Sequence, residues 1–365
     1  MTALLPLEQS LSIEAARPNL VQRTSEQLRC YAQQQAAFFV RHGGRPVSTL
    51  GRFMAGRCGL VGTHNHVYHL LMPGDADPAT VSAVRRELVH AVQSLPEGWD
   101  LAIARADTAN LVGFTAVFSR RWLDLEPTPI QPPPDAEYAT IRGRFIDEAR
   151  HGTAYTTARH ADALRCRYSS HRRSGGFVLH CPLSRMNPQT EVEAFAMRQS
   201  PGPNGPVRTR DRFTLWLTRD PGRTFTIPRL VSDAVDGPIV RSEIVEAINL
   251  ARAKERRRNV REDATRSQAA AVLWDPKGSP YAHAGLAALQ FYDLAGQPGH
   301  VPWASMTVEV HETASAGELM DDVLASPFAR AMLVSDSNIA ISVEPASGLT
   351  STRVLFLAYG RQPLF

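Results

Sequence analysis

The stretch TASAGELMDDVLASPFARAMLVSDSNIAISVEPASGLTSTRVLFLAYGR, residues 313–361, predicts a helix followed by a two-stranded hairpin. Its residues Ser315–Glu318 fit a capping box, in which the serine oxygen accepts from the third helical amide and the glutamate returns to the serine amide. The alternating runs 339–343 and 353–361 are typical of paired strands. This segment is therefore expected to belong to an α+β domain.

A second stretch, residues 77–120, has the same order of patterns far upstream. A helical segment runs from Asp77 to Val92, and the apolar runs 101–104 and 112–118 follow as a second hairpin. The repeat predicts that the N-terminal and C-terminal parts of the chain have similar folds and that the middle part has a different one. A chance similarity between two common helix-and-hairpin units is the alternative.

A helix is predicted upstream of each of the two helix-and-hairpin stretches. Thr24 and Gln27 fit a capping box before an apolar period that Gly43 and Gly44 end. Ser242 is the expected cap of a helix that carries Ile244, Ile248 and Ala251. The outer thirds are expected to be α plus β, with helices packed on hairpins.

The prolines of residues 127–134 predict an extended linker. Short alternating segments with frequent turn residues follow, which is the pattern of a small antiparallel β-sandwich. The predicted parts are an α/β N-terminal domain at 1–126, the linker at 127–135, the β-sandwich at 136–235 and an α+β domain at 236–365.

Composition indicates a folded chain, because 43% of the 365 residues are hydrophobic and 21% are charged. Its 40 basic residues are interleaved with 36 acidic ones, and the cluster Lys254–Arg258 sits at a predicted helix end, so nucleic-acid binding is not expected. No apolar run is long enough to span a bilayer, so an integral membrane protein is not expected either.

The four cysteines fall into two local pairs, Cys30 with Cys58 and Cys166 with Cys181, which favours two disulfides over four buried thiols. Disulfides persist outside the reducing cytosol. Residues 1–16 argue against an intact signal peptide. We expect a secreted, periplasmic or cell-surface protein whose export signal is not visible in this chain, with a cytoplasmic protein as the alternative.

In order, Ile248–Ala253, Thr307–Glu309, Ala325–Leu333 and Ile339–Val343 resemble elements of the CAP superfamily, which includes the cysteine-rich secretory proteins, antigen 5 and plant pathogenesis-related proteins. The resemblance covers about residues 240–361 and implies an α/β/α sandwich. It also implies that the N-terminal domain is a second CAP-like unit.

The resemblance implies a cleft in which two histidines and two acidic residues hold a divalent cation. In the turn Ser326–Arg330 of this chain, Ala329 replaces one histidine, and an alanine cannot bind a metal. Glu309 keeps one carboxylate, and His283 is the nearest candidate for the second histidine. A sparse site that has lost a ligand retains metal poorly, so no metal or other cofactor is expected.

His64, His66 and His69 form the histidine-rich run of the chain, in which two imidazoles at i and i+2 would share a strand face. Without a neighbouring carboxylate, a polar loop or a solvent-facing strand edge explains them better than a metal site. The aromatic residues Trp274, Tyr281, Phe291 and Trp303 would rim the CAP-like cleft, as a recognition surface or as core packing.

These observations predict a non-catalytic exported protein that binds, adheres to or assembles with a protein or another cell-envelope component. The alternatives are a peptide or ester hydrolase that uses Glu309 with His283, His311 or Glu312, and a lipid-binding protein. The identity of the partner and the oligomeric state do not follow from the sequence.

Overall fold

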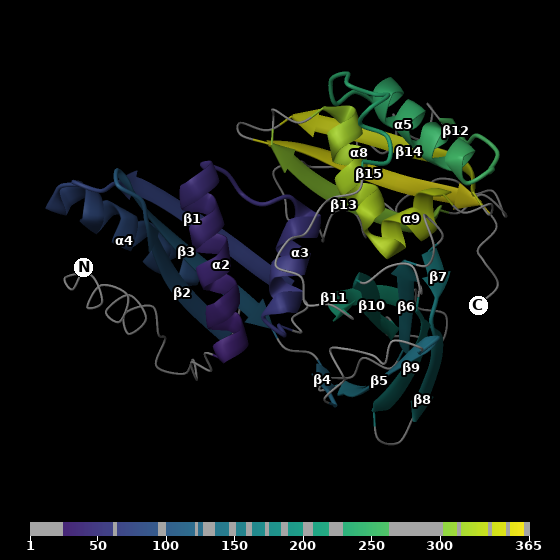
Figure 1. Ribbon diagram of the computed structural model, residues 1–365, viewed down its shortest axis with the longest axis horizontal. Helices are drawn as coiled ribbons and strands as arrows, with labels where there is room; N and C mark the ends of the chain where they lie inside the picture. Colours follow the sequence, from purple (N-terminus) through teal and green to yellow (C-terminus); the bar gives the residue numbers. More distant parts are fainter. Residues whose placement is uncertain are drawn as a thin grey trace. The chain divides into compact units, whose positions relative to one another are not determined.

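The computed structural model describes residues 25–60, 64–93, 100–120, 123–126, 136–145, 151–157, 163–171, 175–183, 189–199, 207–218, 229–262, 302–311, 315–334, 338–347 and 351–360. Two compact units make up the chain. The first comprises Met1–Ala154, Cys166–Cys181 and Pro188–Arg223, and the second comprises Tyr155–Arg165, Pro182–Asn187 and Thr224–Phe365. Helices and small antiparallel sheets occur in both units, which confirms the α+β class (Figure 1).

From residue 25 onward, the described part of the first unit has three helices around a three-stranded sheet. Its elements are α2 (Glu26–His42), α3 (Ser48–Arg57), β1 (His64–Pro73), α4 (Pro78–Gln93), β2 (Asp100–Asp107) and β3 (Leu111–Arg120). The strand order is β1-β3-β2, and both pairings are antiparallel.

Helices cover both faces of this sheet because successive residues of a strand point to opposite sides. Phe114 and Phe118 of β3 lie in one core cluster with Val81 and Val84 of α4. Val117 lies in a second cluster with residues of α2, namely Leu28, Tyr31, Ala32 and Ala36. The N-terminal part is therefore a three-layered helix–sheet–helix arrangement, in which α2 crosses the strands in Figure 1.

The cap of α2 is Ser25, one residue later than the predicted Thr24. The Ser25 hydroxyl accepts the Leu28 amide at 3.1 Å. At the other end Gly43 ends the helix as predicted, with a left-handed φ of 69° and its N–H donated to the Phe39 carbonyl. Glycine adopts this φ without a steric penalty, so the stop follows from the residue type.

Strands of 3 to 12 residues follow in the described middle of the chain. They are β4 (Leu123–Leu125), β5 (Tyr138–Phe145), β6 (His151–Thr157), β7 (Ala163–Arg165), β8 (Arg167–His171), β9 (Gly176–Pro182), β10 (Gln189–Gln199) and β11 (Val207–Thr218). One sheet of the first unit has the order β4-β5-β9-β8, and β10 pairs antiparallel with β11. β7 ends and β8 begins on either side of the buried Cys166.

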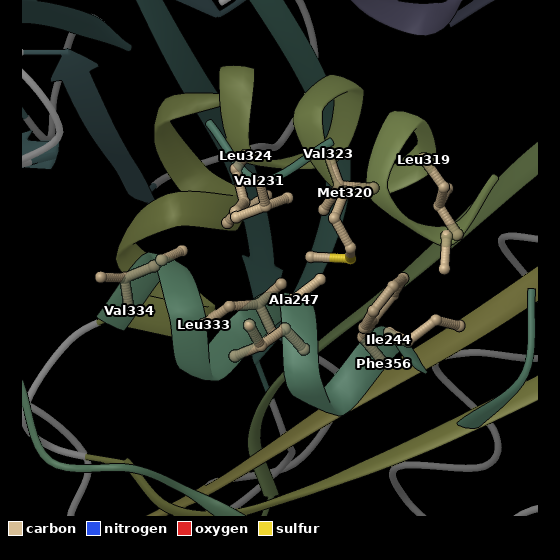
Figure 2. Packing of buried hydrophobic residues seen from close by; sticks show 14 of the residues in the cluster. Val231, Ile244, Ala247, Leu319, Met320, Val323, Leu324, Leu333, Val334 and Phe356 are labelled. Atoms are coloured by element: carbon tan, nitrogen blue, oxygen red, sulfur yellow. The ribbon is translucent and has the colours of Figure 1, made fainter. Parts of the chain in front are cut away.

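In the part of the second unit that the structure describes, helices pack on another antiparallel hairpin. Its described elements from residue 229 onward are α5 (Arg241–Lys254), β12 (Arg261–Glu262), β13 (Pro302–His311), α8 (Ala316–Ala325), α9 (Pro327–Val334), β14 (Asn338–Ser347) and β15 (Ser351–Gly360). The strand order is β12-β14-β15-β13. Figure 2 shows one core in which Ile244 and Ala247 of α5 meet Met320 of α8, Leu333 of α9 and Phe356 of β15.

The capping box at Ser315 is present as predicted. The Ser315 hydroxyl accepts the Glu318 amide at 3.1 Å, and a Glu318 carboxylate oxygen accepts the Ser315 amide at 3.1 Å. The predicted cap Ser242 is wrong, because α5 begins at Arg241 with Val240 in the cap position. Ser242 lies in the first turn of the helix.

The two predicted helix-and-hairpin stretches share more than their order of elements. In each, the strand before the helix pairs with the last strand of the hairpin: β1 with β3, and β13 with β15. The registers also agree. The second residue of β3, Val112, pairs with Met72 of β1 and Asp107 of β2. In the same way, the second residue of β15, Thr352, pairs with Val310 of β13 and Ser347 of β14. The likeness therefore extends to a third strand.

Asp77 caps α4 at the position that Ser315 holds before α8. Its Oδ1 accepts the Thr80 amide at 2.7 Å, and this backbone hydrogen bond is the main cause that lowers the pKa of the Asp77 carboxyl. A lowered folded-state pKa gives stabilisation that is present above the unfolded-state pKa and lost as the pH falls through the folded-state pKa.

We therefore expect Asp77→Ala to destabilise the first unit at neutral pH, and the difference from the wild type to shrink below about pH 4. Urea unfolding in neutral and in acidic buffer, followed by far-UV circular dichroism, measures this difference. Asp75→Ala, in the same exposed turn, is the control. An equal pH-dependent loss in that control would contradict the capping role.

Candidate functional site

In the second unit, the residues that carry the CAP resemblance contact backbone atoms. Arg252 of α5 is 1% exposed; its Nε donates to the Arg258 carbonyl at 2.6 Å and a guanidinium Nη donates to the Leu333 carbonyl at 3.0 Å. Leu333 lies in the last turn of α9, whose carbonyls have no partner within the helix. Arg252 therefore joins α5 to the end of α9.

Asn249, one turn before, fixes the chain after α5. Its amide donates to the Val260 carbonyl at 3.2 Å, and its Oδ1 accepts the Val260 amide at 2.9 Å. Both groups of the asparagine side chain thus hold a single residue next to β12. The asparagine and the arginine of the segment Ile248–Ala253 are therefore explained by the backbone groups that they hold.

The turn at residues 326–330 connects two helices. The Ser326 hydroxyl accepts the Ala329 amide at 3.2 Å, and Pro327 occupies the first position of α9, where its missing N–H is not needed. The Arg330 Nε donates to the Leu324 carbonyl at 2.8 Å, near the end of α8. Serine, proline and arginine in this turn therefore set the junction of α8 with α9.

Ala329, which stands where the resembled turn has a histidine, is fully buried in the core of the second unit. Its methyl group packs in the same cluster as Met332 and Leu333. An imidazole at this position would bring a larger polar ring into an apolar, close-packed region. The described side chains around residue 329 are those of a helix-packing core.

A buried carboxylate ties the segment before α5 to α8. Asp321 is 4% exposed; its Oδ1 accepts the amides of Leu230 at 2.7 Å and Val231 at 2.8 Å, and its Oδ2 accepts the Ser232 amide at 3.3 Å. Lys254 of α5 donates to the Leu230 carbonyl. Three successive residues of the segment before α5 are thus held against α8.

The structure gives only backbone positions for the acidic and histidine candidates that it describes. Glu309 and His311 lie on β13, and the register places them opposite Arg353 and Ser351 of β15. Trp303 lies on the same strand. The other candidates, His283, Glu312, Trp274, Tyr281 and Phe291, lie outside the described residues.

The histidine run lies on β1, an edge strand of its sheet. The His69 Nδ1 is 2.8 Å from the Thr115 hydroxyl, and its ring stacks on Phe39 at 4.5 Å between ring centroids. Because His69 is an odd number of positions from His64 and His66, it belongs to the other face of the strand. Among the described residues, no three His, Cys, Asp or Glu side chains gather closely enough to hold a metal ion.

Both cysteine pairs are bonded: Cys30 with Cys58, and Cys166 with Cys181. The first disulfide links α2 to the end of α3, and the second joins the ends of β8 and β9. No helix in the described part of the chain has the length and apolar character needed to cross a membrane.

The first unit also has an open depression between α2 and α3, which was not predicted from the sequence. Its volume is about 290 Å³, and Gln34, Phe38, Arg41, His42, Met54 and Arg57 line it. A signal was present, because residues 27–74 contain five arginines and no aspartate or glutamate. The near-balance of charge over the whole chain hides this local excess.

The fold and these sites define an α+β protein with small antiparallel sheets and two disulfides. No protein-family model matches the chain, and no curated protein matches it in sequence. A cysteine-rich secretory protein from Staphylococcus aureus subsp. aureus Mu50 is among the similar solved structures, with a TM-score of 0.26 and 9% sequence identity. The match covers 64% of this chain and 87% of that one.

Proposed function

We propose that this chain is an exported, non-catalytic binding protein whose second unit keeps a degenerate CAP-like scaffold. One observation carries the proposal: Asn249, Arg252, Ser326 and Arg330 all use their polar groups to hold backbone atoms. Side chains committed to helix ends and turns do not serve as acids, bases or metal ligands. Function is argued from the site rather than from the fold, and here the motif residues support the scaffold.

Export is supported by the two disulfides, since such bonds persist in oxidising compartments. The proposed partner is a protein or another component of the cell envelope. The proposed organisation keeps an N-terminal α/β domain, a proline-rich linker at 127–135, a β-sandwich and the CAP-like domain.

Zinc titration tests the non-catalytic assignment. When zinc is added to the metal-free protein, we expect no binding heat, no rise in melting temperature and no hydrolysis of peptide or ester substrates. The reason is that a ligand set with alanine in place of histidine at position 329 binds zinc weakly. Calorimetry, thermal unfolding and a chromogenic ester assay are the measurements.

Glu309→Gln separates this proposal from the hydrolase alternative. The variant is expected to keep the envelope partner that the wild type retains in a pull-down, with Glu246→Gln as the matched control on the exposed side of α5. Zinc-stimulated hydrolysis that Glu309→Gln removes would establish the hydrolase instead. Lipid found by mass analysis after detergent-free extraction would favour the lipid-binding alternative.

A further inference from the structure

The depression between α2 and α3 combines cationic and apolar groups. Arg41 and His42 come from the last turn of α2, and Arg57 from the end of α3. Phe38 is half-buried and Met54 is 9% exposed, so the apolar part of the lining is recessed below the arginines. A side chain that enters the depression can therefore touch both kinds of group.

The charge of this region is one-sided. After Glu26 neither helix contains an acidic residue, and Arg29, Arg41, Arg45 and Arg57 are all exposed. The fifth arginine, Arg52, is ion-paired with the buried Glu191 at 2.6 Å. Basic residues in a last helical turn complement the helix dipole. That effect explains the positions of Arg41 and Arg57 but does not require the absence of carboxylates from residues 27–74.

The Cys30–Cys58 disulfide fixes the two sides of the depression. Cys58 follows Arg57 directly, and Cys30 lies one turn before Gln34 on α2. The Gln34 amide nitrogen is 3.1 Å from the Cys58 sulfur and 3.5 Å from the Cys30 sulfur. Arg57 is thereby held at a set distance from α2, and a preorganised site loses less entropy when a ligand binds.

We propose that this depression binds an acidic peptide segment of a partner protein, in which a carboxylate side chain neighbours a bulky apolar one. The guanidinium groups of Arg41 and Arg57 would take the carboxylate, since the planar fork of arginine fits two carboxylate oxygens. The apolar neighbour would cover Phe38 and Met54. No acidic side chain is among the described residues that line the depression, so none of these residues repels a negative charge.

Membranes and nucleic acids fit the same depression less well. Insertion into a bilayer needs apolar side chains that protrude, whereas Phe38 and Met54 are recessed. Nucleic-acid binding without base contacts draws on many phosphate contacts along a strand, and only two arginines line this depression. A short peptide requires no more than the groups that are present.

Fluorescence anisotropy on the full-length oxidised protein tests the proposal, with a labelled octapeptide of alternating glutamate and phenylalanine as the probe. We expect the double variant Arg41→Gln/Arg57→Gln to raise the Kd about tenfold or more. Arg29→Gln makes the same charge change on α2 away from the depression and should alter the Kd by less than about twofold. Glutamine for glutamate in the probe should abolish binding.

A second variant, Arg41→Lys/Arg57→Lys, keeps the charge and removes the planar fork, and it should still weaken binding. Equal affinity of the double glutamine variant and the wild type would overturn the proposal, as would equal binding of the glutamine probe. So would phosphatidylglycerol vesicles or oligothymidine that bind through these arginines when the peptide does not. The inference names a partner chemistry for the binding function and so rests on it. If the peptide does not bind, the zinc titration still tests the non-catalytic assignment. If zinc-dependent hydrolysis is found, the anisotropy measurement still tests peptide binding by the depression.

Discussion

Asp321→Ala is expected to lower the free energy of unfolding of the second unit by about 3 to 5 kcal/mol. The carboxylate accepts three successive backbone amides, those of Leu230, Val231 and Ser232, from a position that is 4% exposed. Alanine would leave these donors without their acceptor and open space next to the apolar core. A buried donor that loses its partner costs more than the hydrogen bond contributes when it is made.

Asparagine at the same position gives a graded test. Oδ1 alone accepts the Leu230 and Val231 amides, so Asp321→Asn can keep both and loses only the longer Ser232 contact to Oδ2. Its cost should be about 1 to 2 kcal/mol. Urea unfolding followed by circular dichroism, on the transition assigned to the second unit, measures both variants.

Asp233→Ala is the matched control. Its side chain is 74% exposed and its ion pair with Arg229 spans 3.4 Å at the surface, so the substitution should change stability by less than about 0.5 kcal/mol. Equal losses for Asp321→Ala and Asp233→Ala would contradict the role of Asp321 in holding the 230–232 segment.

The sequence was sufficient where a few neighbouring residues decide the structure. The capping box of Ser315 and Glu318, the left-handed stop at Gly43 and both hairpins were predicted because each depends on nearby residue types. The errors at Thr24 and Ser242 are shifts of one or two residues in helix starts. At the start of α2 two neighbouring hydroxyls, those of Thr24 and Ser25, can serve as the cap, whereas α5 begins after Val240, which has no side-chain cap.

Long-range polar contacts could not be predicted. Asp321 stands in a helical pattern where an acidic residue ordinarily indicates the solvent side, and its partners lie far upstream in the chain. Arg252 was identified through a family motif, but its burial and its contact with the Leu333 carbonyl follow only from the packing of α5 against α9. A motif states which residue is present, and tertiary structure decides what that residue contacts.

The candidate sites show the same limit. A cleft was inferred from the turn at 326–330, and the turn residues prove to cap and join helices, with Ala329 in the core. The arginine-rich depression was overlooked because charge was summed over the whole chain. Its acid-free stretch, residues 27–74, is visible in the sequence once charge is examined segment by segment.

Gly317→Ala is expected to destabilise the second unit by about 2 to 4 kcal/mol, against the usual sign for a glycine in a helix. A Cβ at Gly317 would collide with the Val235 carbonyl oxygen and would lie 2.7 Å from the Ser232 Cα. Both are backbone atoms of the segment that Asp321 holds, so neither can move aside by a rotamer change. The close approach of the 230–235 segment to α8 therefore requires glycine.

Gly51→Ala in α3 supplies the matched control with the opposite sign. A Cβ there would be 3.7 Å from the nearest atoms of Tyr31 and Gln35, which is ordinary contact, so alanine should stabilise the first unit by about 0.5 to 1 kcal/mol through helix propensity. Thermal and urea unfolding of both variants give the two signs. If Gly317→Ala also stabilised the protein, the close packing of the 230–235 segment on α8 would be wrong. The Asp321 contacts, which depend on the same approach, would then be in question with it.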